Sequence, residues 1–269
     1  MNYAKKTARK FIFPTLMKLG VDKLLRTIKG NSITNVLYHG VVNKDSSYFS
    51  PRHIQKDQFE KHLKYYKKHF KIISIDEAFK ISNPDKRYLT VSFDDGYKNN
   101  LTNALPLLEK YNIPTTFFIC SACVEGTNQL STDSLAAYYS GQKLELLPEE
   151  IWKLLNIDEL IKLSESRIVT IGSHGRFHNY FTERNAIDEL RISKELLFDT
   201  INKRVNLIAY PHGSYNGNIK NLAEIIGYTG QLAVKYKLHG DKKDKRIMKR
   251  HCISSTTTFE SNMIQLCMT

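Results

Sequence analysis

The stretch YLTVSFDDGYKNNLTNALPLLEKYNIPTTFFI, residues 88–119, decides the fold class of this chain. Residues 88–93 are rich in apolar and β-prone side chains and predict a strand, which Asp94-Asp95-Gly96 interrupts. Residues 103–111 show the apolar spacing of a helix, and residues 115–119 again favour a strand. A strand, a helix and a second strand in this order predict a parallel β-α-β unit.

The same alternation continues on both sides of this unit. We expect further strands at residues 34–38, 71–75, 168–171, 207–210 and 231–234, and helices at residues 58–70, 76–81, 158–164, 183–203 and 219–226. The polar residues 121–150 are expected to form an excursion from the core. The pattern predicts an α/β fold with a mostly parallel sheet or barrel, in which chemistry collects where strands end.

Length and composition favour one large domain. The chain has 269 residues, of which 41% are hydrophobic and 25% charged, so it can bury a sizeable core. We expect a basic amphipathic N-terminal segment at residues 1–32 and a single large domain at residues 33–269. The net charge of +13 indicates an anionic partner or surface. Because no nucleic-acid-binding motif is visible, general surface charge is favoured over nucleic-acid binding.

The N-terminal segment alternates basic and apolar side chains. Its apolar run from Phe11 is broken by Pro14 and Lys18, so it is too short to span a bilayer, and it lacks a signal-peptide cleavage site. The chain is therefore expected to be cytoplasmic. A cationic helix with an apolar stripe can pack on the domain, which we favour, or lie on an anionic membrane surface as a peripheral contact.

Four cysteines are too few for a disulfide framework and favour a reducing compartment. Cys120 and Cys123 have C-x-x-C spacing at the end of an apolar run. A structural zinc site would need a second cysteine pair, which the sequence lacks. We interpret the two as buried thiols at a strand end.

Two polar clusters at strand ends together suggest a metal site. In the first, the adjacent carboxylates of Asp94 and Asp95 repel each other, and a divalent cation would stabilise them. In the second, His174 and His178 follow the strand at residues 168–171 and are spaced so that both can reach one metal. An Asp/His/His set with open coordination positions suits metal-assisted hydrolysis.

A third cluster, Tyr210-Pro211-His212-Gly213, follows the strand at residues 207–210. Proline and glycine favour a rigid turn there. The turn can present an aromatic ring and the backbone N–H of His212 to a ligand, although taken alone it is equally typical of a structural turn.

These clusters, in this order, resemble the polysaccharide deacetylases of the NodB-homology group, also called carbohydrate esterase family 4. VSFDDGYKNNLTNALPLLEKYNIPTTFFI (residues 91–119) is similar to the first motif of the family, IGSHGRFH (171–178) to its H-x-x-x-H motif, and IAYPHG (208–213) to its third motif. VLYHG (36–40) resembles the opening strand of the branch that deacetylates poly-N-acetylglucosamine. The resemblance covers residues 33–253 and implies a deformed (β/α) barrel of about seven strands.

The resemblance also implies a role for each residue. Asp95, His174 and His178 would hold one divalent metal ion, usually zinc and sometimes another ion. Asp94 would act as general base, and the backbone N–H of His212 would stabilise the oxyanion beside Tyr210 and Pro211. No late motif supplies an acid, since His239 lies in a lysine-rich loop and His251 in a strand-like run. In the branch of the family with a rearranged motif order, the acid comes from the end of the early strand, so the resemblance implies His39 as the general acid.

Two positions depart from the pattern of the family. Ala209 stands where many members carry an arginine that orients the base, and Arg250 and Arg176 remain equal candidates to replace it. His212 stands where an aromatic residue usually follows the proline, which can alter the sugar pocket.

The expected activity is metal-dependent removal of the N-acetyl group from an N-acetylhexosamine in a glycan or glycan precursor. Two alternatives stay open. The same site can hydrolyse a non-sugar amide or a cyclic imide, or the chain can be a catalytically silent carbohydrate-binding barrel, for which the absent arginine at position 209 is the only argument.

Overall fold

A closed parallel barrel forms the centre of the computed structural model, which describes residues 3–46, 50–125, 146–234, 246–253 and 255–268. Seven strands close it in the order β1 (Ser32–Tyr38), β10 (Ile247–Cys252), β9 (Gly230–Val234), β8 (Leu207–Ala209), β7 (Val169–Ser173), β6 (Thr115–Ile119) and β5 (Arg87–Phe93), which pairs again with β1. All these pairings are parallel. The predicted deformed (β/α) barrel of about seven strands is confirmed.

Strand pairing in the barrel is shortest between β7 and β8, where Ser173 lies opposite Ile208 and no second pair of described residues is in register. By contrast, β1 and β5 pair along their whole length, from Ser32 with Arg87 to Tyr38 with Phe93. The short β4 (Lys71–Ile72) pairs with the start of β5, whereas β6 pairs with its end. The end of β5, which carries Asp94 and Asp95, is therefore held between β1 and β6.

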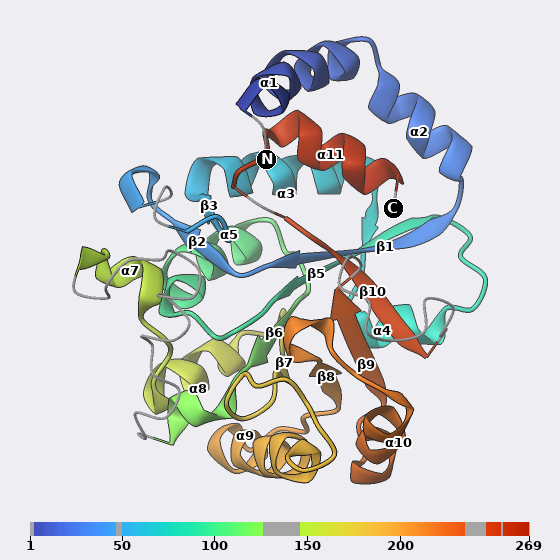
Figure 1. Cartoon of the computed structure of the whole chain (residues 1–269). Helices are drawn as coiled ribbons and strands as arrows, with labels where there is room; N and C mark the ends of the chain where they lie inside the picture. Colours follow the sequence, from blue (N-terminus) through green and yellow to red (C-terminus); the bar gives the residue numbers. More distant parts are fainter. Residues whose placement is uncertain (1–2, 47–49, 126–145, 235–245, 254, 269) are drawn as a thin grey trace.

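Helices surround the barrel (Figure 1). Along β1 lie α3 (Lys56–His69) and α11 (Phe259–Met268), with α1 (Tyr3–Lys18) and α2 (Val21–Lys29) outside them. The opposite side carries α8 (Ile157–Glu165), α9 (Ser193–Ile201) and α10 (Gly217–Ile226). Shorter pieces are α4 (Ile75–Lys80), α5 (Leu105–Lys110), α7 (Glu149–Trp152) and a small parallel pair, β2 (Gly40–Val42) with β3 (His53–Gln55).

The main core lies between the barrel and its helices. Phe93 stacks with Tyr38 at 5.3 Å and with Phe117 at 5.0 Å between ring centroids. Phe59 of α3 meets the edges of Tyr38 and Phe93 at 5.1 and 5.7 Å. All four rings are almost fully buried, so this aromatic cluster joins three neighbouring strands to α3.

A second cluster fills the barrel interior with Phe118, Leu207, Ala209 and Leu232, and Ile75 of α4 packs against it. Gly230 begins β9, and a side chain there would collide with Phe79 of the same helix. Thus α4 covers the amino-terminal end of the barrel and leaves the carboxyl-terminal ends of the strands for the candidate site.

Most elements agree with the sequence-based expectations, and the differences have local causes. The strand predicted at residues 71–75 ends at Ile72, because Ser74 and Glu77 form a capping box that starts α4. The helix predicted at residues 183–203 contains a π-helical turn at Asp188–Ile192 before α9. Strands β2 and β3 and helix α11 were not predicted, and most of the expected excursion at 121–150, as well as His239, lies outside the described residues.

Among the described residues, no helix is both long and apolar enough to cross a bilayer.

The aromatic cluster gives a stability prediction. Phe59→Ala should lower the free energy of unfolding by about 3–5 kcal/mol, because it leaves a cavity among buried rings. Phe198→Ala is the control, since that side chain is 44% exposed and should cost no more than about 1 kcal/mol. Urea unfolding followed by circular dichroism measures both, and equal losses would contradict the role given to the cluster.

Candidate active site

The predicted site residues come together at the carboxyl-terminal end of the barrel. Asp94 and Asp95 follow β5, His174 and His178 follow β7, and His39 follows β1. The segment Tyr210–Gly213 follows β8. Parallel strands end on the same side of a barrel, so short motifs far apart in sequence meet there.

Asp95, His174 and His178 have the arrangement of a metal site. One potential ligand atom from each lies within 4.8 Å of the others. Asp95 Oδ1 is 3.4 Å from His174 Nε2 and 3.3 Å from His178 Nε2. Zinc–ligand bonds of about 2.0–2.1 Å at tetrahedral angles separate ligand atoms by about 3.4 Å. The three side chains therefore fit one small divalent cation.

The carboxylate of Asp95 supports this interpretation. It is fully buried, and neither of its oxygens accepts a hydrogen bond from the described residues. Burial alone would raise the pKa of Asp95, but His178 and His174 outweigh burial and hold it well below its usual range. Burying a carboxylate that accepts no hydrogen bond is costly unless a cation lies nearby.

His174 is oriented by the backbone. Its Nδ1 lies 2.7 Å from the carbonyl oxygen of Ala209, which accepts a hydrogen bond from the Nδ1–H tautomer. In this tautomer, neutral His174 directs the lone pair of Nε2 toward Asp95, where a cation could bind to both side chains. The backbone turns that deliver the ligands are tight, with φ of 77° at Asp95 and 58° at His178.

Asp94, the second carboxylate, has a different environment. Arg250 Nη1 and Nη2 donate to its Oδ1 and Oδ2 at 2.7 and 2.8 Å, and both side chains are buried. Burial raises the pKa of Asp94, but Arg250, together with His174 and His39, more than offsets this and keeps it below its usual value. Arg250 also donates to Ser92 at 3.1 Å and lies over the ring of Phe118.

Of the two arginines that could replace the one absent at position 209, Arg250 is therefore the one that contacts Asp94. Arg176 instead forms a two-pronged ion pair with Glu125, at 2.8 and 2.7 Å. Ala209 faces the barrel interior beside Phe118, and the guanidinium of Arg250 lies 5.0 Å from that same ring. The small side chain on β8 leaves space for an arginine that comes from β10.

A cavity of about 190 Å³ lies beside Asp94, His174 and His178. Its lining consists of His39, Arg52, Asp94, His174, His178, His212, Val234 and Cys252. Arg52, Val234 and Cys252 were missed by the sequence interpretation, because none of them lies in a motif and Arg52 comes from the segment before β3.

His39 faces the cavity in its neutral form. Arg52 Nη1 lies 2.9 Å from His39 Nε2, so the guanidinium donates and the ring nitrogen accepts. Burial and the charge of Arg52 lower the pKa of His39 to about 3. As a general acid, His39 would have to gain its proton during the reaction.

The third cluster divides between cavity and core. His212 lines the cavity, with its ring stacked on that of Tyr180 at 4.1 Å and edge-on to His178 at 4.6 Å. Tyr210 and Pro211 are buried, and the hydroxyl of Tyr210 donates to Gln231 at 2.7 Å. Tyr180 is 49% exposed, so it offers an aromatic surface next to the cavity.

The cysteines are all free thiols. Cys120 is buried, as the sequence predicts, whereas Cys123 is only half-buried, and burial raises the pKa of both.

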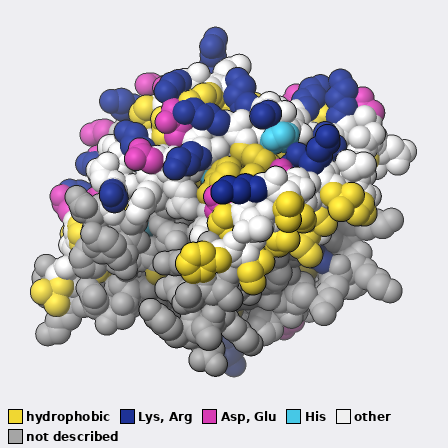
Figure 2. All heavy atoms as spheres, turned by 90° about the horizontal axis from the view of Figure 1, so that it is seen from above, with side chains coloured by type: hydrophobic (Ala, Val, Ile, Leu, Met, Phe, Trp, Pro, Cys, Tyr) yellow, Lys and Arg dark blue, Asp and Glu magenta, His cyan; other side chains and the backbone are white. Residues whose placement is uncertain are grey.

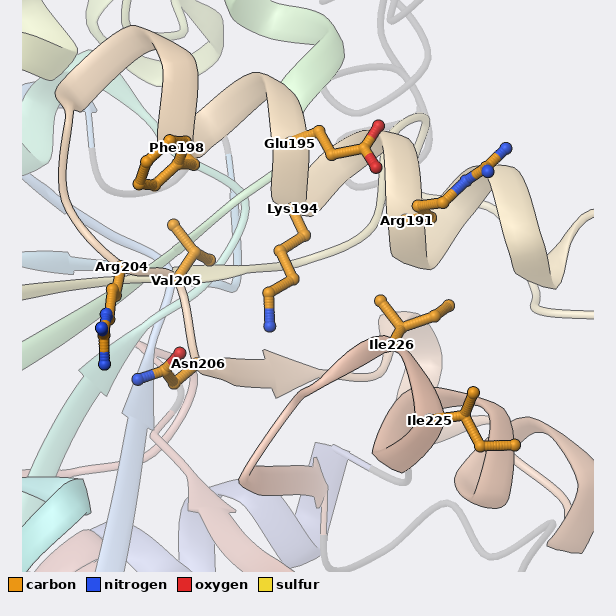
Figure 3. A pocket seen from close by; sticks show the side chains of 9 residues that line it. All are labelled: Arg191, Lys194, Glu195, Phe198, Arg204, Val205, Asn206, Ile225 and Ile226. Carbon is orange, nitrogen blue, oxygen red and sulfur yellow. The ribbon is translucent and has the colours of Figure 1, made fainter.

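A larger hollow of about 640 Å³ lies between α9 and α10, on the outside of the barrel (Figure 3). Lys194, Phe198 and Ile226 are among its lining residues. It contains no histidine or cysteine, and one carboxylate, Glu195, so it lacks the chemistry found at the strand ends.

Known proteins resemble this chain in sequence and in fold. Poly-beta-1,6-N-acetyl-D-glucosamine N-deacetylase of Staphylococcus aureus is 26% identical over 199 residues, which are 71% of this chain and 63% of that protein. The chain spans just under two thirds of the length of the curated relatives it matches.

Two solved structures have the same fold. The deacetylase PplD of Streptococcus pyogenes, in complex with acetate, aligns with a TM-score of 0.67 and 18% identity over 88% of this chain and 99% of that one. IcaB from Ammonifex degensii aligns with a TM-score of 0.66 and 18% identity over 89% and 98% of the two chains. The sequence model described as polysaccharide deacetylase matches residues 81–231, more than half of the chain. The chain therefore belongs to the polysaccharide deacetylase family.

Proposed function

We propose that the protein is a metal-dependent hydrolase that removes the N-acetyl group from an N-acetylhexosamine in a glycan or glycan precursor. One observation carries the proposal: a buried carboxylate without a donor, Asp95, lies against two histidines and beside a second carboxylate held by an arginine. The S. aureus relative, named for deacetylation of poly-N-acetylglucosamine, supports an N-acetylated sugar as substrate.

Asp95, His174 and His178 are the proposed ligands of one divalent ion, with zinc favoured by two imidazole ligands and one carboxylate. Such an ion supplies a Lewis acid and lowers the pKa of water. The ligand set leaves coordination positions open, as hydrolysis requires.

Asp94 is the proposed general base. Arg250 holds its carboxylate in a fixed plane and in the ionised form, so that an oxygen can take the proton of the attacking water. The backbone N–H of His212 donates to the amide oxygen as negative charge develops there. The leaving amine then needs a proton.

His39 is the proposed relay of that proton: neutral at rest, it would take up the proton that Asp94 accepted from water and pass it to the leaving amine. Four histidines line the cavity, and two of them are proposed ligands, while the ring of His212 packs between Tyr180 and His178. His39 remains, and the carboxylates Asp94 and Asp95 partly offset the effects that lower its pKa.

Removing a ligand should abolish metal binding and turnover together. Asp95→Asn and His178→Ala should each reduce the bound metal, measured by isothermal titration and elemental analysis, and abolish acetate release. Asp158→Asn is the control, because this exposed carboxylate lies on α8. Full acetate release in either ligand variant would refute the proposal.

Arg250 should act as a positioning residue. Arg250→Met should lower kcat by about 10- to 100-fold with metal affinity retained, because Asp94 loses its fixed orientation. Since Arg250 lowers the pKa of Asp94, its removal should move the acidic limb of the pH profile toward higher pH.

Two further variants separate this role from a structural one. Arg246→Met is the control, since Arg246 lies four residues earlier in an exposed pair with Glu224. Adding Ala209→Arg to Arg250→Ala tests whether an arginine from β8 restores kcat. An unchanged kcat in Arg250→Met would contradict the assignment.

His39→Gln should lower kcat by about 10²- to 10⁴-fold without loss of metal, as expected for removal of a general acid. Rapid-quench acetate assays measure this. If the variant keeps its rate, Asp94 must return the proton that it accepted.

The choice of bond needs its own measurement. Release of acetate from N-acetylated oligosaccharides, with no opening of cyclic imides, supports the sugar substrate, and the reverse result favours the cyclic-amide alternative. The silent-barrel alternative loses its argument, because Arg250 holds Asp94 although residue 209 is alanine.

A further inference from the structure

Helix α2 exposes apolar side chains to the outside and buries charged ones against the domain. Leu24 and Ile28 lie one turn apart and are 59% and 73% exposed. Asp22 and Arg26 are buried, at 7% and 6% exposure. A surface helix normally buries its apolar side and exposes its charges, so α2 presents to the outside the side that usually faces a core.

A buried polar network holds α2 in this orientation. Arg26 contacts both Asp22 and the hydroxyl of Tyr65 on α3, and that hydroxyl donates to Asp22 at 2.8 Å. Burial raises the pKa of Asp22, but Arg26 and Tyr65 outweigh it and lower the value. Turning the helix over would keep the pair between Asp22 and Arg26, since both lie on α2, but it would break the hydrogen bonds that both side chains form with Tyr65 of α3. The apolar side is thus fixed outward.

The neighbouring helix extends the apolar surface. Phe11 and Ile12 on α1 are 72% and 51% exposed, and Leu19 in the turn before α2 is 74% exposed. Five of the twelve large hydrophobic side chains exposed in the described part of the chain lie within residues 11–28, and the others are spread over separate elements. The expected packing of the stripe on the domain holds for Met17, not for these five.

The charge around this surface indicates the partner. Residues 1–30 contain eight lysines and arginines against a single acidic residue, Asp22, which is paired with Arg26. Lys18 and Lys23 are exposed beside the apolar side chains. Figure 2 looks onto the face that carries α1 and α2 and shows hydrophobic side chains lying among lysines and arginines.

Apolar side chains within a basic field match a bilayer that contains anionic lipids. A second copy of the chain would bring two cationic surfaces together, and a nucleic acid would leave the apolar side chains in water. We propose that α1 and α2 bind the surface of an anionic membrane, with Phe11, Leu24 and Ile28 in the boundary between headgroups and acyl chains.

Vesicle co-sedimentation of the full chain tests this proposal. Binding is expected to vesicles of phosphatidylcholine with 30% phosphatidylglycerol, and much less to phosphatidylcholine alone. The double variant Leu24→Ser/Ile28→Ser should lower the partition coefficient at least tenfold, with unchanged circular dichroism and unchanged acetate release from a soluble oligosaccharide. Ile225→Ser is the matched control, because Ile225 on α10 is 82% exposed and should leave binding unchanged.

Three results would overturn the proposal. They are equal partitioning of the double variant and the original chain, equal binding to both kinds of vesicle, and a dimer in light scattering that the double variant dissociates. The last would make a second copy the occupant. None of these results bears on the proposed hydrolysis, which acetate release measures separately.

Discussion

The buried ion pair between Asp94 and Arg250 is the interaction on which the geometry of the candidate site depends. Asp94 follows β5 and Arg250 lies on β10, and both strands pair with β1. The guanidinium can reach the carboxylate because the barrel closes through β1. Two parallel hydrogen bonds, with Ser92 as a further acceptor, offset much of the desolvation that such a buried pair costs.

This pair gives two adjacent carboxylates different environments. Asp94 has its charge balanced within the protein, whereas Asp95 has buried oxygens with no donor among the described residues and two imidazoles nearby. Neighbouring acids whose surroundings differ in this way are typical of sites that separate proton transfer from metal binding.

The sequence predicted the features that depend on short motifs, but not those that depend on contacts between distant residues. Asp94, Asp95, His174 and His178 stand in short motifs directly after strands, so the motifs alone located the candidate metal site and the barrel. The partner of Asp94 is 156 residues away, and nothing in the local sequence distinguished Arg250 from Arg176. Only the register of β10 against β1, with Val36 opposite His251, decides between them.

The sequence could not predict the position of Arg52 or the orientation of α2, because both depend on contacts with other elements. Arg52 directly precedes β3, and the pairing of β3 with β2 places it beside His39 at the cavity. These strands are three residues long, so their sequences carry no periodic signal. The periodicity of α2 predicts an apolar side but not its direction. Tyr65, on a different helix, sets that direction by binding the charged side.

The connection between α2 and the barrel has a mechanical consequence. Helix α2 ends at Lys29 and β1 begins at Ser32, so only Gly30 and Asn31 separate them. Strand β1 pairs without interruption with β5, which leads directly into Asp94. Any plane on which α2 rests therefore sets the tilt and height of the cavity, and with them the distance from that plane at which a ligand of the cavity lies.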